Sequence, residues 1–286
     1  MTPPSLRAFI SVDMEGVAGV ATFDQIIRGG SGYPRAQELM TAEANAAIRG
    51  AFAGGATEVV VNDSHGTMDN LLHDRLDPRA RLVFGAPRPS CMVQGISAAD
   101  RVAIFVGYHA GAGAPGVLAH TFSSNFTELR VNGAAMTEAE VNGLYAGSLG
   151  VPVGVVTGDD EICDVASKAF AGVRTVEVKK ANGYSAADSL SPAASADLIE
   201  ASVAEAVAAA AELTVADVPE QLTLEIDFAS PLAADFAASV PRTRRLGPRT
   251  LAGEVDDVAE LMRLVMACYY LASLAAQQHA TLAFRR

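Results

Sequence analysis

The chain has 286 residues, 50% hydrophobic and 19% charged, enough for one large α/β domain or a large domain with a smaller one. Its 33 acidic and 21 basic residues give a formal net charge of −12, so we expect neither nucleic acid nor an anionic membrane surface as a partner. The three cysteines, Cys91, Cys163 and Cys268, form no Cys-x-x-Cys motif and indicate neither a disulfide framework nor a thiolate zinc site.

No targeting or membrane segment is predicted. The apolar run that precedes Asp13 is too short for a signal peptide. No window reaches the roughly 20 uncharged apolar residues of a membrane span. We therefore expect a cytoplasmic protein.

Strand and helix patterns alternate up to about Gly183. Short apolar or β-branched runs predict strands, and longer alanine-rich or periodic runs predict helices. The alternation is typical of an α/β fold with a mostly parallel sheet flanked by helices. The predicted strands are 7–12, 57–61, 102–106, 128–131, 152–156 and 173–178, and the predicted helices are 36–53 and 137–149.

The pattern changes beyond Gly183. An alanine-rich helix is predicted for 194–213, a strand for 222–228, and a final helix from about 255 to 276. We expect this part to form a smaller C-terminal α+β region packed on the main sheet. The predicted division is a catalytic, metal-binding α/β domain at 1–183 and the smaller region at 184–286.

Five potential metal ligands lie where the predicted strands end or a helix begins. In an open parallel sheet, ligands bind outside the carboxyl ends of the strands. Asp13 and Glu15 follow the first predicted strand, His65 and His109 follow two others, and Glu138 lies in the first turn of a helix. Each residue alone is also typical of a solvated loop or a helix cap, but together they indicate one site.

Carboxylates and imidazoles are ligands that suit Zn²⁺. The two oxygens of Asp13 would allow it to bridge two ions. A pair of ions can activate water and polarise a carbonyl group together, so the expected chemistry is hydrolysis.

A glycine motif, G-x-G-x-x-G, runs from Gly111 to Gly116 between two histidines. A dinucleotide-binding fingerprint needs a helix to begin at this point, and the residues that follow do not predict one. We therefore expect no bound dinucleotide and interpret the glycines as a loop that carries His120 back toward His109. His120 would then donate a proton or stabilise an oxyanion; the alternative is a loop histidine hydrogen-bonded to the backbone.

Other polar residues receive structural interpretations. His73 and His279 are interpreted as surface or satisfied core histidines, and Asp63 as a turn residue rather than a partner of a ligand imidazole. Asp159 and Asp160, after a predicted strand, are interpreted as helix N-cap residues rather than as part of the site.

Five motifs in order resemble the zinc D-aminopeptidase family of bacteria. The resemblance covers nearly the whole chain, most clearly from Leu6 to about Asp160. The motifs are SVDMEG at 11–16, NDSH at 62–65, GYHA at 107–110, PGVLAH at 115–120, and Glu138.

The resemblance implies a binuclear zinc aminopeptidase, with two zinc ions per subunit, that removes the N-terminal residue from short peptides, D-amino-acid peptides in particular. It further implies a homodecamer of two stacked five-membered rings around a channel that admits only small peptides. By the same resemblance, Asp13 is the bridging carboxylate, Glu15, His65, His109 and Glu138 are the other metal ligands, and His120 is the catalytic histidine.

One position departs from the family pattern, and two alternatives stay open. Gly111 stands where the enzyme that typifies the family has an arginine; if that arginine helps to fix a substrate carboxylate, the resemblance does not extend to a preference for dipeptides. The first alternative is a metallo-amidase that acts on a non-peptide substrate. The second is a non-catalytic, ring-forming binding protein in which zinc organises the loops.

Overall fold

The computed structural model describes residues 6–283 and divides them into two compact units. The first unit comprises residues 6–110, 115–119 and 139–218, and the second comprises 111–114, 120–138 and 219–283.

A seven-stranded sheet forms the centre of the first unit, with the order β3-β2-β1-β4-β7-β8-β9. Neighbouring strands are parallel except for the antiparallel pair β8 and β9, so the predicted mostly parallel sheet is confirmed. The strands are β1 (Arg7–Val12), β2 (Glu58–Asp63), β3 (Arg81–Val83), β4 (Asp100–Tyr108), β7 (Val153–Asp159), β8 (Arg174–Gly183) and β9 (Ala186–Ser189).

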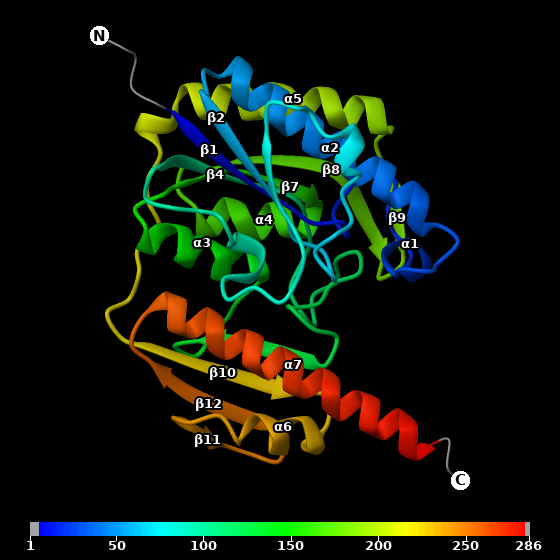
Figure 1. Ribbon diagram of the computed structural model, residues 1–286, viewed down its shortest axis with the longest axis vertical. Coiled ribbons are helices and arrows are strands. Elements are labelled where there is room, and N and C mark those ends of the chain that lie inside the picture. The colour runs from blue at the N-terminus through cyan, green and yellow to red at the C-terminus, as the bar shows by residue number, and fades with distance from the viewer. Residues whose placement is uncertain (1–5, 284–286) are drawn as a thin grey trace. The chain divides into compact units, whose positions relative to one another are not determined.

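Helices cover both faces of this sheet (Figure 1). On one face, α2 and α5 pack against each other over an apolar core to which β1 contributes alternate residues, Ala8, Ile10 and Val12. On the other face lie α3 and α4. The helices are α1 (Phe23–Ile26), α2 (Tyr33–Ala53), α3 (Glu138–Ser148), α4 (Asp160–Ala169) and α5 (Pro192–Ala208), with short 3-10 turns at His73–Arg75, Cys91–Val93 and Ala210–Glu212.

The second unit contains a five-stranded antiparallel sheet, β11-β12-β10-β5-β6, together with α6 and α7. The predicted C-terminal α+β region is thereby confirmed. Its elements are β5 (Phe126–Val131), β6 (Ala134–Ala135), β10 (Leu222–Phe228), β11 (Thr243–Arg245), β12 (Thr250–Val255), α6 (Pro231–Ala237) and α7 (Val258–Ala283).

The observed division differs from the predicted boundary at residue 183. Residues 184–218 belong to the first unit, because β9 pairs with β8 and α5 packs on α2. Conversely, β5 belongs to the second unit, because it pairs with β10. The β5–β10 pairing and the packing of α5 on α2 join segments that are distant in sequence, which local patterns cannot reveal, whereas β8 and β9 form a local hairpin that was not predicted.

Helix α7 is the one helix in residues 6–283 that is long and apolar enough to cross a membrane by length and composition. The apolar window, Val258–Thr281, includes the charged residues Glu260 and Arg263, and half of it is buried inside the structure. Leu261, Val265 and Cys268 are fully buried. This burial is typical of a core helix, which passes the same test as a membrane span.

Asp159 joins two segments at the end of β7. One carboxylate oxygen accepts a hydrogen bond from the Ile162 N–H at 3.0 Å, which confirms the predicted N-cap, and the other accepts from the buried Val117 N–H at 2.7 Å. We expect Asp159→Ala to lower the free energy of unfolding by about 2 kcal/mol, since it removes a cap and leaves a buried donor unsatisfied. Urea denaturation checks this, with the exposed Asp164→Ala of the same helix as a control that changes little.

Candidate metal centre

The loop after β1 carries Asp13 and Glu15 and is held against the end of β4. The Gly16 N–H donates a hydrogen bond to the Gly107 carbonyl at 2.8 Å. A Cβ atom at position 16 would lie 1.9 Å from the Tyr108 carbonyl oxygen, so only glycine fits. Both carboxylates are about 98% buried as a result, each residue being only 2% exposed.

His65 follows β2 and faces both carboxylates. Its Nδ1 lies 2.9 Å from Glu15 Oε2 and 3.3 Å from Asp13 Oδ1, and its Nε2 lies 2.8 Å from the Ile26 carbonyl oxygen. Because a carbonyl can only accept, Nε2 carries a proton; Nδ1 faces the carboxylates and would offer its lone pair to a cation once it has lost its own proton. The Ile26 carbonyl thus orients His65 as a ligand that would bind a cation through Nδ1.

His109 follows β4 and reaches the other oxygen of the same carboxylate. Its Nε2 lies 3.3 Å from Asp13 Oδ2, and its Nδ1 lies 2.9 Å from the Ala110 carbonyl oxygen. By the same reasoning, Nδ1 carries the proton and Nε2 is the nitrogen available to a cation. Asp13 therefore presents one carboxylate oxygen to each of two histidines.

Electrostatics within this cluster favour a bound cation. Burial raises the pKa of Asp13, and the charge of Glu15 raises it further, against hydrogen bonds to His109 and His65. Burial lowers the pKa of His65, but the Glu15 charge and hydrogen bonds to both carboxylates outweigh it and hold that pKa well above its usual value. Two buried carboxylates that repel each other are stabilised when a positive charge lies between them.

The donor set fits zinc. Asp13, Glu15 and His65 each offer one atom, and these atoms lie within 4.8 Å of one another. Carboxylate oxygen and imidazole nitrogen, with a ring orientation fixed by a backbone carbonyl, are the ligands and supporting contacts that zinc sites use.

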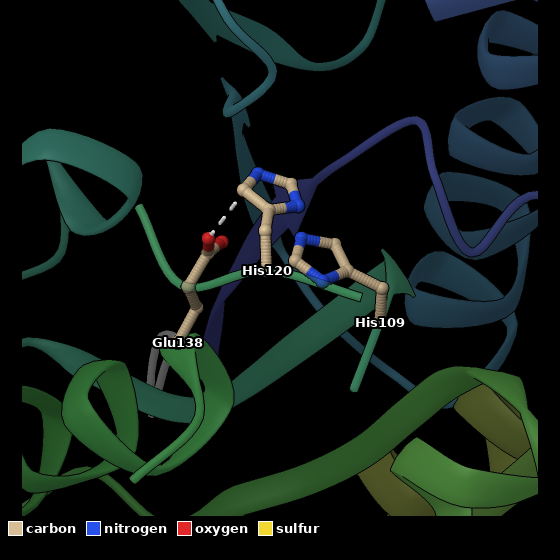
Figure 2. Close-up of side chains that lie close together, drawn as sticks. All are labelled: His109, His120 and Glu138. Atoms are coloured by element: carbon tan, nitrogen blue, oxygen red, sulfur yellow. Dashed lines mark ion pairs between the residues drawn. The ribbon is translucent and has the colours of Figure 1, made fainter. Parts of the chain in front are cut away.

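His120 and Glu138 are brought together in the second unit. His120 Nε2 lies 3.8 Å from Glu138 Oε1, and Figure 2 shows this ion pair as a dashed line. Glu138 Oε1 accepts a hydrogen bond from the Phe122 N–H at 2.5 Å. Phe122 has a left-handed backbone, with φ at 57°, and the tight turn that it forms sets His120 and Glu138 side by side.

The glycine-rich segment 107–120 forms turns, and no helix begins after Gly116. Within the second unit, a Cβ atom at Gly111 would lie 3.3 Å from Thr137 Cγ2 and 3.4 Å from Thr121 Oγ1. A Cβ atom at position 111 would need the two threonines to shift by a few tenths of an ångström, and Gly111 is itself partly exposed.

Asp63 organises the loop that follows His65. Its carboxylate accepts hydrogen bonds from the Asn70 and Leu71 N–H groups at 2.6 and 2.7 Å and from the Asn70 side chain at 2.8 Å. The Asn70 amide also donates to the His65 carbonyl at 2.6 Å. Asp63 is the last residue of β2 and not a turn residue; its carboxylate nevertheless has the structural role that was predicted, because it holds the loop that follows.

Two buried charged residues beside the β1 loop were not predicted. Glu43 lies on the buried face of α2. Its helical spacing from the buried Ala36, Met40 and Ala47 is visible in the sequence and could have indicated that Glu43 is buried. Lys179 lies in β8 at an irregularity in its pairing with β7, and this irregularity turns it inward. Simple strand alternation after the buried Val178 would have placed it in solvent, so it could not be predicted.

Comparison with known proteins gives consistent matches over nearly the whole chain. A family model described as D-aminopeptidase matches residues 6–267. A D-aminopeptidase of Bacillus subtilis (strain 168) is 34% identical over 268 residues, which are 93% of this chain and 98% of that protein. A solved structure, described as the Zn-dependent D-aminopeptidase DppA from Bacillus subtilis, a self-compartmentalizing protease, has a TM-score of 0.91 at 34% identity and covers 94% of this chain and 98% of its own.

Proposed function

Because the chain belongs to the D-aminopeptidase family of peptidases, we propose that it is a binuclear zinc enzyme that removes N-terminal D-amino acids from short peptides. Family membership makes the chain a hydrolase. The relative described as Zn-dependent supports zinc as the metal, and support for two ions comes from Asp13, whose two oxygens each face a different histidine. A carboxylate in that position suits a bridge between two cations.

We assign the ligands as follows. Asp13, Glu15 and His65 Nδ1 would hold one zinc ion, and Asp13 and His109 Nε2 would hold the other. We further propose Glu138, at the start of α3, as a metal ligand; this assignment rests on membership of the family, whose model matches residues 6–267.

The chain's own residues would prepare and complete the hydrolysis. Zinc, when bound, would activate a water molecule and polarise the scissile carbonyl. The Ile26 and Ala110 carbonyls hold the two imidazole rings in the orientation that ligation needs. We propose that His120, about a quarter exposed and paired with Glu138, transfers a proton to the leaving amine or stabilises the developing oxyanion.

We also propose a homodecamer and a cytoplasmic location. The relative with the solved structure is described as self-compartmentalizing, which supports a closed assembly that restricts entry to small peptides. The three cysteines are free and buried, as suits a reducing compartment. Light scattering of the purified protein measures the subunit number, and a mass of one or two subunits would contradict the decamer.

A panel of substrates tests the proposed reaction. We expect D-alanyl peptides and D-alanyl amides to be hydrolysed faster than their L-forms and faster than amides without a free α-amino group. Hydrolysis confined to amides of the last kind would instead support the metallo-amidase, an alternative favoured by Gly111, which offers no side chain to a substrate carboxylate. Zinc binding without hydrolysis of any of these would support the binding protein.

A further inference from the structure

The loop that carries Asp13 and Glu15 encloses a buried ammonium group. Lys179 is 2% exposed, and its Nζ donates hydrogen bonds to three backbone carbonyls of this loop: Glu15 at 2.5 Å, Val17 at 3.0 Å and Val20 at 2.5 Å. An ammonium has three donors, and here each has one carbonyl acceptor. Three carbonyls that point toward one another repel unless a positive charge lies between them.

A buried carboxylate holds the same loop from another side. Glu43 Oε1 accepts hydrogen bonds from the Ala18 N–H at 3.0 Å and from the Ser195 hydroxyl at 2.6 Å. Glu43 is 2% exposed and its charge acts on Lys179. The ammonium of Lys179 thus holds three carbonyls of the loop, and the carboxylate of Glu43 holds the Ala18 N–H; both side chains come from other elements of the first unit.

We propose that Lys179 is a positioning residue for the metal centre: its ammonium gathers the carbonyls of residues 15, 17 and 20 and so fixes the loop that presents Asp13 and Glu15. This inference rests on the proposed zinc centre. On this proposal Lys179 of β8, a strand that contributes no ligand, holds the ligands Asp13 and Glu15 in place before a cation binds. The benefit is preorganisation, because a loop already in its bound shape loses less conformational entropy when it binds.

Zinc affinity of Lys179→Met tests the proposal. Methionine keeps an unbranched apolar side chain of similar length and removes the charge and all three donors. We expect the zinc dissociation constant, measured by competition with a chromophoric chelator, to rise about 10- to 100-fold, the usual scale for residues that support metal ligands. We also expect the visible absorption of bound Co²⁺ to change, since ligand geometry sets that spectrum.

Lys180→Met is the matched control. Lys180 is the next residue on β8, its side chain is 65% exposed, and its Nζ lies 3.8 Å from Glu177 Oε1. The Lys180→Met variant should have the same zinc affinity and the same Co²⁺ spectrum as the wild-type protein. A folded Lys179→Met protein that matches wild type in both readouts, even with a lower melting temperature, would overturn the inference and reduce Lys179 to a purely structural residue.

A second measurement needs no variant. In metal-free wild-type protein, we expect the amides of residues 13–20 to exchange hydrogen nearly as slowly as those of β1, because the loop is already fixed. Exchange as fast as in an exposed turn would overturn the inference, including when Lys179→Met fails to fold. The proposed function fails separately, if wild-type protein binds no zinc; the exchange data then still show whether the loop is fixed in the absence of a cation.

Discussion

Asp13→Ala is expected to abolish zinc binding at both positions and to lower kcat/KM for a D-alanyl peptide by at least about 10³-fold. The reason is that Asp13 faces both His65 and His109 and so supports both proposed positions. Metal catalysis contributes several kcal/mol to the transition state, and each 1.36 kcal/mol is a factor of ten in rate. Elemental analysis and steady-state kinetics on the same preparation measure both effects.

The matched control is Asp69→Ala, which removes a partly exposed carboxylate from the loop after His65. Zinc content and kcat/KM should remain at wild-type values in this variant. A fully active Asp13→Ala protein with two zinc ions per chain would show that Asp13 is not the bridging ligand.

His120→Ala is expected to lower kcat by about 10²- to 10⁴-fold, the range for acid–base groups, while the zinc content stays unchanged. The physical reason is that His120 is assigned a proton-transfer or oxyanion role and not a ligand role. Its Nε2 lies 3.8 Å from Glu138 Oε1, a distance too long for a hydrogen bond.

His73→Ala serves as the comparison, because His73 lies in a 3-10 turn and packs edge-on against Phe84. It should retain wild-type kcat. If His120→Ala instead lost zinc and kept its residual rate per bound ion, His120 would be a ligand rather than a proton-transfer group.

Much of the fold follows from local patterns in the sequence. The apolar runs at 7–12, 57–61 and 102–106 correspond to β1, β2 and β4, since buried parallel strands are apolar on both faces. The strand β12 was missed because TLAGEV lies directly before a helical pattern that was extended back to residue 255. Helix α5 ends at Ala208 rather than at 213, where the chain tightens into a 3-10 turn.

The candidate ligands could be found because their positions follow a topological rule. Asp13, Glu15, His65 and His109 all lie just beyond the carboxyl ends of adjacent parallel strands, and the structure brings them together. The contacts that orient them could not be found, since Ile26 and Ala110 contribute only backbone carbonyls and Lys179 is turned inward by an irregular strand pairing.

The central claim is a binuclear zinc centre, and metal content per chain tests it most directly. Untagged protein, purified without chelators and without added zinc, should contain about two zinc ions per chain by elemental analysis, because each carboxylate oxygen of Asp13 faces a different histidine. Protein that contains no metal and takes up no zinc when it is added would contradict the account.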